Sequence, residues 1–409
     1  MPVDCDLHVH GRYSIGVSAS LDFPSLAAAA RRKGLGLLGT GDILHPIWRE
    51  EFGKVAVEKE DGVYEVAVLP GGSPIGAGPS GTAASSSSSS SSVRFVASTE
   101  VESKGRIHHL ILLESLEAAD KLAAALRPHS SLRSDGRPRV KLEGEALARL
   151  VVENGGLIGP AHAFTPWTSL FGSKESLDGC YGAMTDSVSF LELGLSADSS
   201  YADRISSLHP LVFLTGSDAH SAHPAKFGRE FTRMDLREEG FEGLRRALRR
   251  NSDRILLNVG VPPEHGKYNR TACTRCYEQY ERADADSRKW KCPCGGRIKV
   301  GVRDRVAALG DLPEGKHPAH RPPYRRMLPL AELAGLALKK GPATKAVAAK
   351  CDALISRFGN DIAVLLDAGL REIGEVAGEG VARAVELARA EKLVIDPGGG
   401  GNYGRARLP

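Results

Sequence analysis

The sequence predicts an α/β protein, and three observations support that fold class. Over the first 258 residues, strand-like apolar runs alternate with helical patterns. Four cysteines then gather in one short basic segment, and periodic Ala and Leu follow towards the end of the chain. Alternating strands and helices favour a parallel architecture, open or closed. We therefore expect an α/β domain, a small cysteine module and a helical region, in that order.

The predicted α/β domain covers residues 1–258. Its strands are expected at 34–40, 93–99, 108–113, 155–162, 188–193 and 210–215. Helical patterns lie at 25–34, 144–156 and 241–251, and the first two contain Gly34 and Gly155 as helix C-terminal signals. Residues from about 71 to 92 are rich in Gly, Pro and Ser and cannot bury enough apolar surface to order themselves. They predict a disordered surface insertion.

Two smaller regions complete the predicted organisation. Residues 259–325 form a basic cysteine module with a Pro-rich linker at its end, and residues 326–409 form a helical domain with a Gly-rich tail. Between 261 and 330, 15 Lys and Arg stand against 8 Asp and Glu, a surplus of 7 beside a net charge of +4 for the whole chain. This local charge suits a polyanionic partner, although a solvated charged surface also explains it.

Composition excludes several classes of protein. The chain of 409 residues is 42% hydrophobic and 25% charged, which is ordinary for a globular protein with a sizeable core. It has no apolar run of membrane-spanning length and no signal sequence, so we expect a cytoplasmic protein without a membrane partner. Its 7 cysteines, with four in one cluster, argue against a disulfide framework.

Strong metal-ligand side chains stand at the ends of most predicted strands in the first 230 residues. In a βα barrel such strand ends converge on one mouth, so these side chains are expected to meet there. Their number indicates two or three ions. His together with carboxylate suits Zn²⁺, Mn²⁺ or Fe²⁺ better than Mg²⁺ or Ca²⁺, and the candidates taken forward are Zn²⁺, Mn²⁺ and Mg²⁺. Of two adjacent histidines in one strand, only one can face the site. The candidates are His8, His10, Asp42, His45, Glu100, His108 or His109, His162, Asp218 and His220.

In order, DLHVH, Glu100, the HHL of the next strand, PAH and SDAH resemble the motifs of the polymerase and histidinol phosphatase (PHP) superfamily. The resemblance implies a distorted (βα)₇ barrel with a multinuclear phosphoesterase site. It favours His109 over His108, because His109 directly precedes the Leu of the motif. Asp42 or His45 would stand in for a Thr-Asp-His that many members carry. The implied ligands are His8, His10, Glu100, His109, His162, Asp218 and His220.

A narrower resemblance, to the endonuclease Q family, spans nearly the whole chain. It rests on LGTGDILHPIW, STEVES, PAHAFTPW, ELGLSADSS, GSDAHS, FGREF, the cysteine cluster and PPYRRMLPL, whereas the PGGGGNYG tail departs from the family pattern. It implies a nucleoid-associated DNA-repair endonuclease that cuts 5′ to a deaminated base (uracil, hypoxanthine, xanthine) or an abasic site. Damaged DNA would be its partner, with a replication clamp or another repair protein as a further partner. Two alternatives stay open: a phosphatase of a small phosphorylated metabolite, and a non-catalytic nucleic-acid-binding protein.

The cysteines have the spacing of a structural zinc site. Cys273 and Cys276 form CxxC, and Cys292 and Cys294 form CxC after fifteen intervening residues. A closed shell of four thiolates leaves no position for chemistry, so one Zn²⁺ is expected to fold the module. Its exposed cations would contact DNA phosphates, unless the module is only a stabilising knob with a charged surface. The DNA-binding candidates are Arg229, Arg275, Lys289, Lys291 and Arg297.

Asp218 is the predicted catalytic residue. In a metal-dependent phosphodiesterase a carboxylate can bridge ions or orient the attacking water, whereas His cannot bridge. The GSDAHS turn that carries Asp218 also carries His220 and follows an apolar strand. The sequence therefore predicts that this turn closes the metal site.

Overall fold

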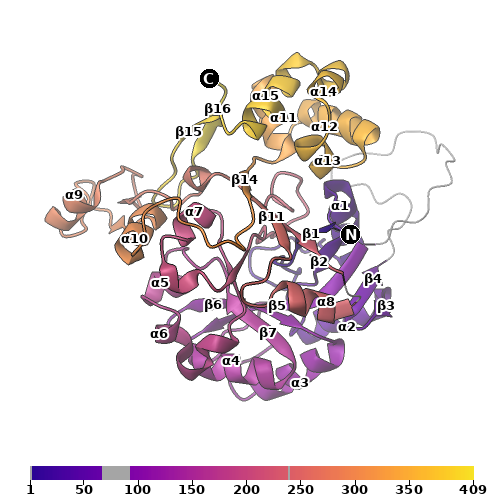
Figure 1. Cartoon of the computed structure of the whole chain (residues 1–409), viewed down its shortest axis with the longest axis vertical. Helices are drawn as coiled ribbons and strands as arrows, with labels where there is room; N and C mark the ends of the chain where they lie inside the picture. Colours follow the sequence, from indigo (N-terminus) through magenta and orange to yellow (C-terminus); the bar gives the residue numbers. More distant parts are fainter. Residues whose placement is uncertain (1, 67–92, 238–239) are drawn as a thin grey trace.

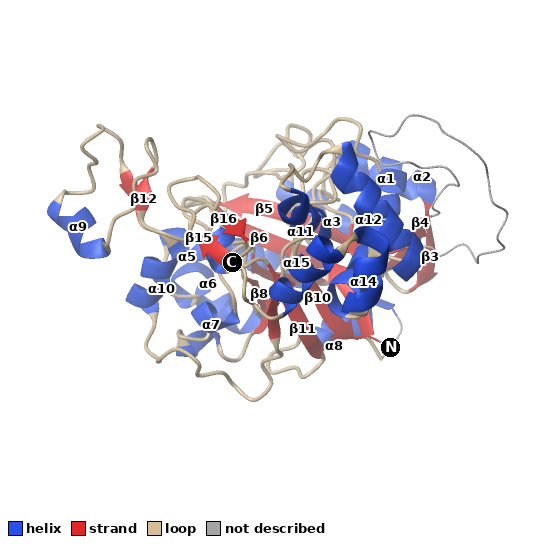
Figure 2. Ribbon diagram, turned by 90° about the horizontal axis from the view of Figure 1, so that it is seen from above, coloured by secondary structure: helices blue, strands red, loops and turns tan. Residues whose placement is uncertain are grey.

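The computed structural model describes residues 2–66, 93–237 and 240–409, so the predicted insertion at about 71–92 lies outside the described residues. The α/β barrel and the C-terminal helices lie one above the other in Figure 1. The cysteine module projects to one side, and Figure 2 places α9 and β12 at the end of the molecule opposite β3 and β4. None of the helices in the described ranges is long and apolar enough to cross a membrane.

Seven strands surround the interior of the barrel. β1 (Pro2–Asp6) pairs in parallel with β2 (Leu37–Gly39), and β2 pairs in parallel with β5 (Val93–Ser103). β5 pairs with β6 (Ile107–Leu113), β6 pairs with β7 (Gly156–Pro160), and β8 (Phe190–Glu192) pairs in parallel with β9 (Val212–Leu214). Beyond the end of β7, the Ala163 amide donates to the Glu192 carbonyl of β8 at 2.8 Å. A parallel bridge from Val9 to Ala219 joins the end of β9 back to the end of β1. These seven strands confirm the predicted distorted barrel.

One strand of the ring runs against the others, which corrects the expectation of a wholly parallel barrel. β6 is antiparallel to both β5 and β7. The start of β6 therefore lies at the same rim as the C-terminal ends of its neighbours. This is why His108, near the start of β6, reaches the barrel mouth, where it meets Glu100 of β5 and His162.

Helices cover the outside of the barrel, and local sequence explains where they begin and end. In α1 the Asp22 side chain caps the Ser25 amide, and Gly34 ends the helix at φ 99°, a left-handed conformation that favours glycine. The face of α1 that carries Leu26, Ala27 and Ala30 is buried against the strands. The helices around the barrel are α1 (Phe23–Lys33), α2 (Pro46–Val55), α3 (Leu116–Leu126), α4 (Gly144–Glu153), α5 (Leu170–Ser173), α6 (Asp178–Tyr181), α7 (Ser199–Ala202) and α8 (Gly240–Ala247).

Additional strands extend the sheet beyond the ring on both sides. β10 (Phe231–Asp235) is antiparallel to β1, and β11 (Ile255–Gly260) is antiparallel to β10. β14 (Tyr324–Arg326) then adds in parallel to β11. On the other side, β3 (Ala56–Glu60) and β4 (Val63–Val66) form a hairpin against β5. The boundary predicted at 258 thus falls inside β11, and the Pro-rich linker ends by joining the barrel sheet.

The cysteine module is a small unit held by the Gly-rich tail. The tail lies along residues 264–270: the Gly398 amide donates to the Glu264 carbonyl at 2.8 Å, and the Gly404 amide donates to the His265 carbonyl at 3.0 Å. A Cβ at Gly398 or Gly404 would lie within 2.6 Å of backbone oxygens, so glycine is required for this close approach. The elements are β12 (Ala272–Cys273), α9 (Arg282–Ser287), β13 (Ile298–Lys299), α10 (Val302–Leu309), β15 (Val394–Asp396) and β16 (Arg405–Arg407).

The C-terminal helices form the predicted helical domain above the barrel. Their apolar faces meet in a core that includes Leu333, Leu354 and Val385. A buried ion pair with a Lys33 Nζ to Asp361 Oδ2 distance of 3.5 Å ties α13 to α1 of the barrel. The domain consists of α11 (Leu330–Leu338), α12 (Lys345–Phe358), α13 (Asp361–Leu366), α14 (Leu370–Ala377) and α15 (Glu379–Arg389).

Candidate metal centres

The barrel mouth gathers metal-ligand side chains from distant parts of the chain. In each of three overlapping groups, one donor atom from every member lies within 4.8 Å of the others. Glu100 and His10 each belong to two groups, so the groups form one continuous cluster. The groups are His8, His10 and Glu100; His10, Asp218 and His220; and Glu100, His108 and His162.

Unusual backbone conformations turn three polar residues towards this mouth. Asp42, His162 and Asp218 have φ of 50°, 30° and 48°, in the left-handed region that non-glycine residues rarely adopt. Each stands just beyond the end of a barrel strand. Such conformations persist where the surrounding structure determines them, and they concentrate at functional sites. These strand ends are therefore built to present side chains and not merely to turn the chain.

His8 is held by a carboxylate that the sequence analysis missed. Its Nδ1 lies 2.7 Å from Glu192 Oε2, which also accepts the His162 amide at 2.8 Å. Burial opposes charge on His8, but Glu192, Asp218 and Glu100 outweigh it and raise the His8 pKa to about 9. Glu192 ends β8 within the apolar FLEL run, so its position at a strand end was the available signal. Glu192 orients His8 so that Nε2 points into the cluster.

Asp42 orients His10, and its carboxylate is not a member of any donor group in the described residues. Its Oδ1 lies 3.0 Å from His10 Nδ1, while Oδ2 accepts the Gly11 amide and the Ser14 hydroxyl at 2.6 and 2.7 Å. Because both oxygens have protein donors, the geometry contradicts the prediction of Asp42 as a metal ligand. His45 lies outside the cluster too, with its ring stacked on Tyr13 at 4.3 Å.

The choice of His109 over His108 is wrong in this structure. His108 Nδ1 lies 2.7 Å from Glu100 Oε1, and its Nε2 lies 3.1 Å from Glu102 Oε2. His109 points to the other side of β6, where its two ring nitrogens contact the Ser103 and Tyr181 hydroxyls at 2.8 Å. Burial and the charge on His108 lower the His109 pKa to about 3. The motif order pointed to His109, but the alternation of side chains along β6 decides which histidine faces inward, and it turns His108 towards the cluster.

The cluster fits bound divalent metal. Two ring nitrogens, His8 Nε2 and His162 Nδ1, are buried without a hydrogen-bond partner among the described residues. His8 Nε2 lies 3.8 Å from Glu100 Oε1 and 3.7 Å from Asp218 Oδ1, so it faces two carboxylates without bonding either. Burial disfavours ionisation of Glu100, but His108 and His162 outweigh it and hold its pKa well below the usual value. A buried, ionised carboxylate surrounded by histidines is a typical ligand set for Zn²⁺ or Mn²⁺.

A cavity of about 730 Å³ opens onto the cluster. Cluster residues His108, His162, Asp218 and His220 lie in its wall, and Asp218 is 34% exposed there. Aromatic side chains come from three parts of the chain: the loop after β7, the segment before the cysteine module, and the Gly-rich tail. They are Trp167, Tyr268 and Tyr403.

Cationic side chains line the same cavity. The Lys267 ammonium lies 5.1 and 5.8 Å from the Tyr268 and Tyr403 ring centres. Arg229, a predicted DNA-binding residue, also lines it, and its Nε donates to the Ser217 carbonyl at 3.3 Å. The cavity therefore offers positive charge and aromatic surface beside metal-ligand side chains, a combination that suits nucleic acid. The cations in its wall are Arg106, Arg137, Arg139, Lys226, Arg229 and Lys267.

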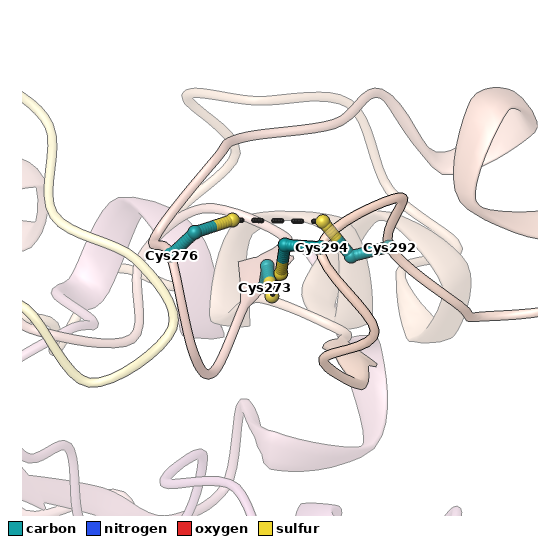
Figure 3. Close-up of side chains that lie close together, drawn as sticks. All are labelled: Cys273, Cys276, Cys292 and Cys294. Atoms are coloured by element: carbon teal, nitrogen blue, oxygen red, sulfur yellow. Dashed lines mark hydrogen bonds between the residues drawn. The ribbon is translucent and has the colours of Figure 1, made fainter.

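The four cysteines form a second and separate metal-type group. One sulfur from each lies within 4.8 Å of the others, and Figure 3 shows the four side chains turned towards one centre. The Cys276 and Cys292 sulfurs are 3.5 Å apart, as are those of Cys273 and Cys294. Only a small core, with Ala285, Ile298, Tyr280 and Trp290, supports them. This geometry fits the predicted tetrahedral zinc site.

The remaining DNA-binding candidates surround the cysteine site at the surface. Arg275, Lys289, Lys291 and Arg297 are all exposed. None of the four pairs with a carboxylate in the part of the chain that the structure describes. Arg275 Nη1 donates to the Cys294 carbonyl at 3.0 Å, which ties its side chain to the fold of the module. These cations remain available to an external anion.

One protein family and two known proteins are similar in sequence to this chain. Residues 329–392 match the family described as the MJ0043 C-terminal domain. The Methanocaldococcus jannaschii protein MJ0043 is 44% identical over 252 residues, which cover 60% of this chain and 31% of that protein. The chain thus spans about a third of that relative. The Bacillus subtilis protein YqxK is 32% identical over 423 residues, and the match covers 98% of this chain and 98% of YqxK.

Two solved structures match over the full length. The lesion-specific endonuclease Q of Pyrococcus furiosus has a TM-score of 0.88 and 43% identity, and the match covers 100% of this chain and 96% of that one. An endonuclease Q in complex with a 27-mer duplex that carries an abasic lesion at the active site has a TM-score of 0.89 and 42% identity, with 100% and 97% covered.

The barrel, its cluster of histidines and carboxylates, and these matches define a metal-dependent phosphoesterase of the PHP superfamily. Within it the narrower resemblance is confirmed. The chain belongs to the endonuclease Q family.

Proposed function

We propose that this chain is a DNA-repair endonuclease that hydrolyses the phosphodiester on the 5′ side of a deaminated base or an abasic site. The observation that carries the proposal is the cavity beside the metal-ligand cluster. Metal-ligand side chains and cations from the barrel, and aromatic rings from the barrel, the segment before the cysteine module and the tail, all line this one cavity. A metabolite phosphatase needs the metal cluster, but it has no use for the exposed cations of the cysteine module.

In this proposal the barrel residues hold two or three divalent ions. His8, His10, Glu100, His108, His162, Asp218 and His220 would be the ligands. Such ions lower the pKa of a bound water and neutralise charge on a phosphoryl group. The protein's own part is to fix the donor atoms, and Glu192, Asp42 and Glu102 do this by hydrogen bonds to His8, His10 and His108.

Asp218 is the proposed catalytic residue. Its carboxylate lines the cavity. The Oδ1 atom lies 3.1 Å from His10 Nε2 and 3.7 Å from His8 Nε2. Burial disfavours its charge, but the hydrogen bond from His10 and the charges of His8 and His10 outweigh this and lower the Asp218 pKa. Asp218 therefore stays ionised and can accept a hydrogen bond from the attacking water.

The exposed cations of the cysteine module bind the duplex outside the cavity in this proposal. Arg275, Lys289, Lys291 and Arg297 would contact phosphates and position the lesion, while one structural Zn²⁺ maintains the module. Selection of damaged nucleotides would use the lower cost of unstacking a mispaired or missing base. In this proposal the protein acts at the nucleoid, where its duplex substrate lies, and a replication clamp is a further proposed partner.

The experiment is a nicking assay on labelled duplexes that contain uracil, hypoxanthine or an abasic site, with an undamaged duplex as control. Wild type and Asp218→Ala are compared with Mn²⁺, Mg²⁺ and Zn²⁺ in turn. We expect a metal-dependent cut 5′ to the lesion that Asp218→Ala lacks. Intact lesion duplexes together with hydrolysis of a small phosphomonoester would instead establish a metabolite phosphatase. DNA binding without any turnover would establish a non-catalytic protein.

A further inference from the structure

A fixed positive charge, Arg137, lies beside the metal-ligand cluster. Its Nη1 is 3.2 Å from Glu100 Oε2, and its side chain is 21% exposed in the wall of the cavity. Glu100 is its one hydrogen-bond partner in the described residues. A guanidinium has five N–H donors in a rigid fork, so most of the hydrogen-bonding capacity of Arg137 is not used by the protein.

The segment that carries Arg137 is held on both sides. The Asp135 carboxylate accepts the amides of Ile15 and Arg137 at 3.3 and 3.2 Å, and the Gly136 amide donates to the Tyr13 carbonyl at 3.0 Å. Further along, the Glu102 amide donates to the Pro138 carbonyl at 3.0 Å. The backbone at Arg137 is thus fixed relative to the end of β5, which carries Glu100.

Gly136 links the position of Arg137 to that of His10. A Cβ at Gly136 would lie 2.5 Å from Asp42 Oδ2 and from the Ser14 hydroxyl, so the chain passes directly over the carboxylate that orients His10. The same packing therefore sets the metal ligand and the guanidinium. An arginine that served only a surface role would not need this close approach.

Electrostatics explain what such a cation is for. A permanent positive charge next to a site for divalent ions is repelled by them and is costly to bury. Glu100 compensates only part of that charge, because its Oε1 is shared by His108 and His162 at 2.7 and 2.8 Å. An anion that lies between the ions and the guanidinium removes the repulsion. Phosphate geometry matches the fork of arginine, which makes a phosphodiester the matching ligand.

We propose that Arg137 is a catalytic residue that donates hydrogen bonds to a non-bridging oxygen of the scissile phosphodiester. This inference rests on the proposed function. In the reaction a bond forms between the water oxygen and phosphorus, the bond from phosphorus to the leaving oxygen breaks, and the water proton passes on to the leaving oxygen. Arg137 keeps its protons throughout. It stabilises the charge that grows on the non-bridging oxygen in the transition state.

The test compares Arg137→Ala and Arg137→Lys with Arg133→Ala, a matched control that removes an exposed arginine from the same segment. Single-turnover nicking is measured with the metal that supports wild type, and duplex binding with Ca²⁺. Bound metal per chain is measured by mass spectrometry. We expect Arg137→Ala to lower the single-turnover rate by about 10²- to 10³-fold. Arg137→Lys should be intermediate, duplex affinity should change by less than about tenfold, and bound metal should equal that of wild type.

Chemical rescue separates a catalytic from a structural role. Added guanidinium chloride at millimolar concentration should raise the rate of Arg137→Ala and leave Asp218→Ala inactive. A wild-type rate for Arg137→Ala, or a loss of bound metal that accounts for its whole defect, would overturn the inference while the proposed function stands. If wild type cuts no lesion duplex, the proposed function fails instead. Titration of the metal-loaded wild type and Arg137→Ala with inorganic phosphate then decides the inference, and equal affinities would overturn it.

Discussion

The two metal-type sites of this chain are built in opposite ways. The barrel cluster draws its donors from His8 to His220, and further carboxylates hold the histidines in place. The cysteine site takes its four sulfurs from Cys273 to Cys294, and a core of a few residues supports it. The first is organised by the fold of a whole domain. The second is proposed to be organised by a zinc ion.

This difference separates chemistry from stability. A phosphodiesterase needs donor atoms that are fixed before substrate arrives, and the carboxylates behind the histidines provide this. A closed cysteine site has no open position for a substrate, so its contribution is the fold of the module around it. Changes in the barrel cluster should therefore reduce catalysis and leave the fold intact. Changes in the cysteine site should unfold the module and leave the catalytic rate nearly unchanged.

The largest effect is expected from Glu100→Gln. Glu100 belongs to two of the three donor groups and contacts His108, His162 and Arg137. An amide lacks the negative charge that holds divalent ions, so nicking should fall by roughly 10³-fold. Single-turnover assays on an abasic duplex measure this, with the exposed Glu117→Gln as control. A loss below tenfold would mean that Glu100 does not bind the ions.

A smaller effect is expected from Glu192→Gln, because Glu192 acts through His8. The amide keeps an acceptor for the His162 amide but cannot hold His8 as a carboxylate does. Metal affinity or nicking should fall by about 10- to 100-fold. Titrating the rate against metal concentration measures the shift, and added metal should restore most of the rate. A loss that metal does not restore would place Glu192 in the chemistry itself.

Removal of the structural zinc should affect duplex binding more than the reaction. Cys292→Ser takes one sulfur from the cysteine group, and the small core of the module cannot hold it without the ion. We expect protease cleavage between 259 and 325. Duplex affinity should be weaker by on the order of tenfold, because the four exposed cations proposed to contact phosphates lose their positions. Saturating single-turnover nicking should stay within a few fold of wild type. Cys351→Ala, in α12, is the control. If Cys292→Ser lost as much nicking activity as Glu100→Gln, the two sites would not divide catalysis and stability in this way.

The comparison also explains which features the sequence could predict. The grouping of the four cysteines could be predicted in full, because these residues are close in sequence. Most members of the barrel cluster could be predicted, because His and Asp at strand ends follow a known motif order. Three details were not: the role of Asp42, the inward face of His108, and the support of His8 by Glu192. Each depends on the direction of a single side chain in the folded barrel, which spacing along the chain does not determine.

The smallest effect on catalysis is expected from Glu230→Gln, because Glu230 belongs to neither metal-type group. Burial raises the Glu230 pKa to about 8, and Oε1 accepts the Val261 amide at 2.9 Å. Its unfolded pKa is near 4.3, so between pH 4.3 and 8 the folded chain binds one more proton than the unfolded chain. Stability from this group therefore falls as pH rises through that window, by up to about 1.4 kcal/mol per pH unit. The Gln variant has no proton to lose at this position, so its stability should not fall with pH for this reason. The measurement is thermal unfolding of both proteins at pH 5, 6.5 and 8. Relative to wild type, the free energy of unfolding of the variant should rise by at least about 1 kcal/mol between the lowest and the highest pH, with nicking unchanged. Parallel curves for the two proteins would mean that Glu230 is ionised in the folded chain.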